Sequence, residues 1–228
     1  MSTGWHMEPL VGFDLETTGT DPAEARIVTA AVVETAGGEP VRRRCWLADP
    51  GVPVPAEATA VHGITGERAA AEGRPAREVA AGIAASLAGH WALGRPVVAY
   101  NAAFDLSLLA AELRRYGLPS LELGPVIDPL TIDRAVDRYR KGRRTLSDVC
   151  REYGVVLDSA HEAGADALAA VRVALAIASR YPQVAKAELE ELHRDQVRWY
   201  GEWAEGYQAW LRSRGDVGAV VDGRWPVR

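Results

Sequence analysis

Asp14 and Glu16 stand two positions apart inside the apolar segment VGFDLETTG, which spans residues 11–19. Side chains of a strand alternate between its two faces, so both carboxylates should point the same way, with their Cα atoms about 7 Å apart. Two partly buried anions at this separation repel each other and lose hydration. No Lys or Arg lies between Val11 and Asp21 to neutralise them, so we expect a divalent cation. A strand edge with both acids in solvent is the alternative interpretation.

Two further acids occupy the first turns of expected helices. Asp105 follows an apolar strand and opens one helix, and Asp166 opens another further along the chain. A helix N-terminus favours a carboxylate through its dipole alone, so neither acid is diagnostic by itself. His161 precedes Asp166 by five residues in a loop. For a single histidine, a surface or capping role is the plain alternative to catalysis.

Acids from three separate elements, each at the end of a strand or helix, form a pattern that none of them forms alone. All-oxygen ligands favour Mg²⁺ or Mn²⁺ over zinc. Such a cluster could hold two ions about 4 Å apart, which clamp a phosphate between the attacking water and the leaving oxygen. A neutral histidine, with an ordinary pKa of about 6.5, could accept the proton of that water. The residues therefore point to metal-dependent hydrolysis of a phosphodiester.

Hydrophobic periodicity predicts an α/β fold, a mixed sheet flanked by helices, that would bring these acids together. The expected strands span residues 9–16, 26–35, 41–48, 96–100 and 125–128, and short turns join the first three as an antiparallel meander. The expected helices span residues 76–91, 104–117, 129–140, 145–153 and 164–180. The Pro-rich segment 49–58 reads as a loop.

A further helix is expected over residues 183–212. Apolar side chains recur on it at spacings of three, four or seven, at Leu189, Leu192, Trp199, Trp203 and Trp210. Packing on the catalytic domain is one interpretation of this stripe. A surface for self-association or for a partner protein is the other, because aromatic residues are enriched at interfaces. We expect a domain over residues 1–182 and a C-terminal helical extension with an irregular tail over residues 183–228.

The composition is that of a soluble globular protein, with 48% hydrophobic and 25% charged residues. The N-terminal residues do not read as a signal peptide and no run of about 18 apolar residues occurs, so we expect a cytoplasmic protein without a membrane span. The formal charge of −5 is compatible with a nucleic-acid partner if four acids belong to one metal site. The basic segment 137–144 ends in Arg143 and Arg144, which would contact backbone phosphates or simply end a solvated helix.

Three motifs carry a resemblance to a known family. FDLETTG (13–19), NAAFD (101–105) and HEAGAD (161–166) resemble the exonuclease motifs of the DEDD superfamily of 3′→5′ exonucleases. A histidine stands five residues before the last acid, so the chain resembles the histidine (DEDDh) subclass. PAEATAVHGITGE (55–67) resembles a loop of epsilon-type proofreading subunits of bacterial DNA polymerase III. The resemblance covers about residues 8–180 and implies the ribonuclease H-like fold.

The resemblance also implies roles for single residues. The metal ligands for two Mg²⁺ or Mn²⁺ ions would be Asp14, Glu16 and Asp166, with Asp105 completing the four-acid set, and the general base would be His161. The residues expected around the terminal nucleotide are Thr17, Thr18, Glu57 and His62, with Asn101 organising the second motif.

The activity implied is a metal-dependent 3′→5′ exonuclease that releases nucleoside 5′-monophosphates from single-stranded or frayed DNA, in proofreading or repair. The same chemistry on RNA, as in RNA trimming or oligoribonuclease relatives, stays open because the sequence does not reveal how the 2′-OH is treated. An inactive nucleic-acid-binding module is the alternative from another class, and the intact set of acids argues against it.

Overall fold

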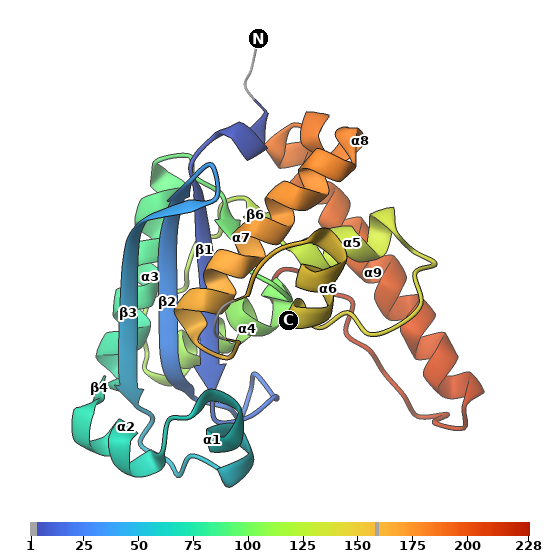
Figure 1. Ribbon diagram of the computed structural model, residues 1–228. Helices are drawn as coiled ribbons and strands as arrows, with labels where there is room; N and C mark the ends of the chain where they lie inside the picture. The colour runs from blue at the N-terminus through green and yellow to red at the C-terminus, as the bar shows by residue number, and fades with distance from the viewer. Residues whose placement is uncertain (1–3, 158–159) are drawn as a thin grey trace.

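A mixed sheet forms the centre of the molecule and confirms the expected α/β architecture (Figure 1). The computed structural model describes residues 4–157 and 160–228. Its strands are β1 (Leu10–Thr17), β2 (Ile27–Ala36), β3 (Glu39–Asp49), β4 (Arg74–Pro75), β5 (Val97–Val98) and β6 (Val126–Ile127). Their order is β4-β3-β2-β1-β5-β6. The first three strands form the predicted antiparallel meander, and β5 and β6 continue the sheet parallel to β1.

Helices cover both faces of this sheet. The described helices are α1 (Ala56–His62), α2 (Gly66–Glu72), α3 (Ala76–Ala92), α4 (Ala102–Arg115), α5 (Pro129–Val136), α6 (Leu146–Tyr153), α7 (Ala163–Arg180), α8 (Pro182–Lys186) and α9 (Leu189–Ser213), with a 3₁₀ turn at Trp5–Met7. Helix α7 crosses one face over β1 and β2, and α3 lies behind the sheet (Figure 1). Within the described ranges, no helix combines the length and the apolar character needed to cross a bilayer.

The alternation of side chains along β1 decides which face carries the acids. Val11, Phe13 and Leu15 are buried in the core that the sheet shares with α3 and α4, which leaves Asp14 and Glu16 on the face that α7 covers. Burial of each apolar side chain stabilises the fold by about 1.5–3 kcal/mol. A slip of one residue would place both carboxylates in that core. The apolar residues therefore fix the register that aims the acids at α7.

Gly12 allows α7 to lie directly on β1. A Cβ atom at this position would be 2.4 Å from the main-chain oxygen of Ala167 and 3.1 Å from Cγ2 of Val171. Because glycine has no Cβ, the backbone of the helix reaches the strand two residues before Asp14. Asp166, the neighbour of Ala167, is brought close to the strand in this way.

The C-terminal extension differs from the single helix predicted over residues 183–212. The structure has α8 and α9 instead, because Ala187 and Glu188 adopt extended backbone conformations between them. Helix α9 packs on α5 and β6, so its first half is joined to the domain. Its second half extends away from the sheet (Figure 1).

The chain after Ser213 has no helix or strand, as predicted, but it is packed against the domain. It folds back from the tip of α9 toward α4 (Figure 1). Trp225 is 5% exposed and belongs to the same core as the apolar residues of β1. The main-chain N–H of Arg228 donates to Oγ of Ser107 at 2.8 Å. The tail therefore ties α9 to the domain, and a boundary at residue 182 stays a prediction.

Two expected boundaries are wrong. The predicted loop over residues 49–58 ends early, because α1 begins at Ala56 directly after Pro55, whose fixed φ suits a helix start. The helix predicted over residues 129–140 ends at Val136. The buried carboxylate of Asp133 accepts hydrogen bonds from Arg140 and Arg144, and these contacts hold the following residues as a loop.

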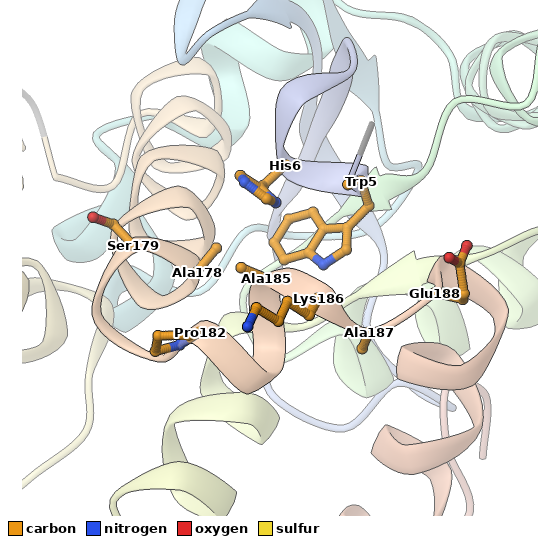
Figure 2. A pocket seen from close by; sticks show the side chains of 10 residues that line it. Trp5, His6, Ala178, Ser179, Pro182, Ala185, Lys186, Ala187 and Glu188 are labelled. Atoms are coloured by element: carbon orange, nitrogen blue, oxygen red, sulfur yellow. The ribbon is translucent and has the colours of Figure 1, made fainter. Parts of the chain in front are cut away.

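The N-terminal 3₁₀ turn packs against the C-terminal end of α7 and against α8. The indole N–H of Trp5 donates to the main-chain oxygen of Val184 at 3.0 Å. Figure 2 shows Trp5 and His6 next to Ala185 and Lys186 at a pocket of about 510 Å³. None of the candidate site residues lines this pocket, so it is separate from the acid cluster.

Candidate active site

Strand β1 and the first turns of α4 and α7 bring the four predicted acids into one cluster. The main-chain N–H of Leu15 donates to Oδ1 of Asp105 at 3.0 Å, which ties the start of α4 to β1. Burial, and then the charges of the other three acids, raise the pKa of Asp14 well above its usual range. All four carboxylates therefore lie within electrostatic reach of one another.

Burial dominates the electrostatics of the cluster. Asp105 is 3% exposed, Asp166 8% and Glu16 9%. Burial raises the pKa of Glu16 to about 7, and the charge of Asp166 adds to the shift. Burial likewise raises the pKa of Asp105 and of Asp166. Carboxylates in this state either take up protons or bind a cation.

His161 is tied to Asp166 by its own main chain. Its N–H donates to Oδ2 of Asp166 at 3.0 Å, and the residue adopts a left-handed conformation with φ 67°. Such a conformation costs about 1–3 kcal/mol for a residue other than glycine and is common at functional sites. The imidazole and the carboxylates of Glu16 and Asp166 offer ligand atoms that all lie within 4.8 Å of one another. The exposed imidazole thus stands at the edge of the acid cluster.

The cluster fits a hard divalent cation. Oδ1 of Asp166 is buried and accepts no hydrogen bond from a described residue. None of the four acids forms a salt bridge to a Lys or Arg of the described ranges. An unpartnered buried carboxylate oxygen costs about 1–3 kcal/mol or more, and carboxylate oxygens are the ligands that such cations prefer. The residues present therefore suit the metal ions that the sequence predicted.

Asp128 organises the site and was missed by the sequence analysis. It is 1% exposed and accepts hydrogen bonds from the N–H groups of Asn101 and Ala102 at the start of α4, at 3.0 and 3.1 Å. Its charge also contributes, after burial, to the raised pKa of Asp105. An Asp directly before a Pro signals a helix start, and Asp128 does cap α5. Its hydrogen bonds to the start of α4 could not be predicted from neighbouring residues, because these partners are distant in sequence.

His62 joins the VHGIT segment to the acid cluster. Its Nδ1 accepts the N–H of Ile64 at 3.1 Å, while its Nε2 is buried without a described partner. Burial lowers the pKa of His62. A main-chain interaction with Thr17 acts to raise this pKa, and the charge of His161 lowers it further. The structure therefore brings His62 beside both the turn after β1 and the candidate base.

The other expected nucleotide contacts lie on three elements. The hydroxyl of Thr17 donates to a main-chain oxygen two residues later, and the hydroxyl of Thr18 accepts the N–H of Arg26. Both threonines thus shape the turn at the end of β1. Asn101 adopts a left-handed conformation just before α4. Glu57 is exposed in the first turn of α1 and makes no side-chain hydrogen bond or salt bridge to another described residue.

Arg143 and Arg144 differ in their availability for a phosphate. The Arg143 side chain is 83% exposed, with Nε 3.6 Å from a carboxylate oxygen of Asp148. The Arg144 side chain is only 12% exposed and forms a salt bridge with the buried Asp133. Arg144 therefore builds the loop, and a phosphate contact remains a proposal for Arg143.

The sequence comparisons place this arrangement in a family. Residues 11–174 match the family described as Exonuclease (RNase_T). The chain is 31% identical over 163 residues to a DNA polymerase III PolC-type from Streptococcus thermophilus, an alignment that covers 72% of this chain and 11% of the relative. The matched part is thus about a tenth of the relative's length.

Two solved structures share the fold. Exonuclease I from Methylocaldum szegediense matches with a TM-score of 0.64 and 25% identity, covering 77% of this chain and 41% of that one. E. coli exonuclease I in complex with a dA16 oligonucleotide matches with a TM-score of 0.63 and 21% identity, covering 78% and 42%. This chain therefore spans less than half of either structure.

This chain belongs to the exonuclease family. The predicted resemblance to the 3′→5′ exonucleases and the predicted ribonuclease H-like fold are both confirmed. Members of the family depend on divalent metal ions, which agrees with the oxygen-rich donor set. Helix α9 and the tail lie beyond the matched residues.

Proposed function

We propose that this chain is a metal-dependent 3′→5′ exonuclease that releases nucleoside 5′-monophosphates from the ends of single-stranded or frayed DNA. The observation that carries the proposal is the convergence of four carboxylates, of which Glu16, Asp105 and Asp166 are buried and Asp14 is partly buried. None of them forms a salt bridge to a described Lys or Arg. A phosphodiester is an anion, so this cluster would repel it without cations in between. The site is therefore suited to phosphate chemistry only in its metal-loaded form.

The residues take distinct roles in this proposal. Asp14, Glu16 and Asp166 hold two Mg²⁺ or Mn²⁺ ions, and Asp105, fixed by the main chain of β1, completes the set. When bound, the ions neutralise phosphate charge and lower the pKa of the attacking water. His161 accepts the proton of that water, since its imidazole is exposed while its main chain is anchored to an acid of the cluster.

The neighbouring loops would receive the terminal nucleotide. Thr17 and Thr18 line the turn at the end of β1, and His62 brings the VHGIT segment against that turn. Glu57 on α1 would contact the same nucleotide, and Asn101 would organise the second motif at the start of α4. A pocket closed around the terminal nucleotide by these residues would restrict the reaction to strand ends, while the 3′→5′ direction follows from the family.

DNA is the favoured substrate because of the relatives. The sequence relatives are DNA polymerases, and the E. coli structure contains a deoxyadenosine oligonucleotide. By the same likeness, the proposal includes proofreading beside a DNA polymerase. A preference for a mismatched over a matched 3′ end in a duplex would support that role, and equal rates on both would contradict it.

The deciding experiment is digestion of a 5′-labelled DNA strand and of its RNA twin, side by side in Mg²⁺. We expect a ladder of products shortened from the 3′ end, with faster loss of DNA. EDTA or the Asp14→Ala substitution should abolish it. Glu8→Ala, which removes a carboxylate outside the cluster, is prepared in parallel and should stay active, so that a loss in Asp14→Ala is specific to the cluster. Activity that survives in Asp14→Ala would show that the cluster is not the active site. Faster loss of RNA would reassign the substrate.

A further inference from the structure

A groove of about 1110 Å³ lies between α9, α5 and the loop that follows α5. Helix α9 forms one wall, and this helix lies beyond residues 11–174, which match the exonuclease family. Tyr100 and Asn101 are part of the groove lining. They directly precede α4, whose first turn carries Asp105. The groove lining therefore reaches the residues that precede α4, whose first turn belongs to the acid cluster.

Helix α9 carries three aromatic rings in a row, Trp203, Tyr207 and Trp210, here called the aromatic ladder. Trp203 and Tyr207 line the groove, and Trp210 continues the row beyond the lining residues. The spacing of four and three residues places them on one face of the helix. The rings of Trp203 and Tyr207 are 5.5 Å apart with planes at 10°, and those of Tyr207 and Trp210 are 5.7 Å apart at 13°. Tyr207 is 41% exposed and Trp210 is 53% exposed. Near-parallel, accessible rings of this kind are platforms on which nucleic-acid bases stack.

The opposite wall is cationic. Arg134, Arg138, Arg140 and Arg144 line the groove, and Glu202 is the one acid among its described lining residues. Arg140 and Arg144 are engaged by the buried Asp133, as described above. Arg134 and Arg138 form no salt bridge with any residue of the described ranges. The Arg134 guanidinium lies 3.9 Å from the ring centre of Trp203, so charge and aromatic surface meet in one place.

We propose that this groove binds the single DNA strand behind its 3′ end, with bases stacked on the aromatic ladder and phosphates at Arg134 and Arg138. The inference rests on the proposed function, since it supplies the path by which a strand reaches the acids. Net positive charge at an aromatic surface complements a polyanion with exposed bases. A second copy of this chain is a less suitable occupant, because it would place its own arginines against Arg134 and Arg138.

Gly206 provides a substitution that alters the groove without disturbing its walls. It lies in the groove lining, and a Cβ at this position would meet no atom within 4 Å. Gly206→Glu and Gly206→Gln add side chains of equal size, and both residues favour a helix more than glycine does. They differ only in charge.

The second test is Tyr207→Ala with Trp210→Ala, and the matched control is Val197→Ala, an exposed apolar position of α9 outside the groove.

The experiment measures two properties of the full chain. The first is the affinity for a 5′-fluorescent strand of about twelve thymidines, by anisotropy in EDTA. The second is hydrolysis in Mg²⁺ of that strand and of a trinucleotide too short to reach the ladder. The double ladder variant should bind the long strand roughly fivefold or more weakly for each ring lost. Gly206→Glu should bind it more weakly than Gly206→Gln. The rate on the trinucleotide should stay unchanged, as should every property of Val197→Ala.

The two proposals fail differently. A wild-type chain that hydrolyses neither substrate would overturn the proposed function, while the anisotropy measurement would still decide whether the groove binds DNA. Ladder and Gly206 variants that bind and hydrolyse the long strand as the wild type does would overturn the groove. The groove proposal would also be overturned if light scattering showed that the wild type is a dimer and Trp210→Ala is not, while the affinity for the strand stayed unchanged. That result would assign the ladder to a second copy of the chain.

Discussion

Gly12→Ala should inactivate the enzyme although Gly12 touches no substrate in the proposed mechanism. The new Cβ would be 2.4 Å from the main-chain oxygen of Ala167, whereas ordinary contact begins at 3.4 Å, so α7 and β1 must separate by about 1 Å. Overpacking of this kind costs about 1–3 kcal/mol, which lowers the melting temperature by roughly 2–12 °C in a chain of this size. The same displacement carries Asp166 away from Asp14, and an error of about 1 Å at a reacting centre costs roughly 100-fold in rate.

The assay is the rate of DNA hydrolysis at several Mg²⁺ concentrations, with the melting temperature recorded on the same samples. Gly89→Ala is the control, because its Cβ would meet nothing within 4 Å and alanine favours the helix by about 1 kcal/mol. Adding Ala167→Gly to Gly12→Ala should not restore activity, since the clash is with a main-chain atom. A folded Gly12→Ala protein with the wild-type rate and Mg²⁺ requirement would refute the idea that the approach of α7 positions Asp166.

Three further predictions concern single side chains. Burial raises the pKa of Glu16 from 4.5 to about 7, so its contribution to the free energy of unfolding of the metal-free protein is fully present below pH 4.5 and falls by about 3 kcal/mol as the pH rises to 7. The Glu16→Gln protein should not show this loss. Denaturant titrations in EDTA that give the same pH dependence for both proteins would contradict the prediction. His161→Ala should lose about 10²- to 10⁴-fold in turnover while Mg²⁺ still binds in calorimetry, and unchanged turnover would remove it as the base. Asp128→Ala should leave buried N–H groups of α4 and α5 unpaired at about 1–3 kcal/mol each, and an unchanged melting temperature would disprove this role.

Features encoded by local sequence were predictable. The alternation of Val11, Phe13 and Leu15 defines a strand, and that strand necessarily carries Asp14 and Glu16 on its other face. Helical periodicity located α7 to within one residue at its start. The partners of the strand acids came from motif resemblance, because no rule of spacing says that residues 105 and 166 lie beside residue 14.

Features that depend on contacts between distant segments were not predictable. Gly12 reads as a weak strand residue until the backbone of α7 is seen against it. Trp225 lies in a Gly-rich tail that local composition marks as irregular, yet it fills a gap in the core. The loop that shortens α5 is held by Asp133, whose arginine partners are seven and eleven residues away. In each case the decisive contact is a tertiary one, which hydrophobic periodicity does not register.

Asp128 links the acid cluster to the part of the chain outside the family match. Its carboxylate holds the start of α4, its N–H donates to Oε1 of Gln196 on α9, and it also accepts a hydrogen bond from the indole of Trp225 in the tail. Gln196 is fully buried, and an unpaired polar group there would be costly. Helix α9 is therefore fixed relative to the first turn of α4 by polar contacts as well as by apolar packing. A strand stacked on the aromatic ladder would consequently meet the acids in a constant register, so that each cleavage requires movement of the DNA rather than of the protein.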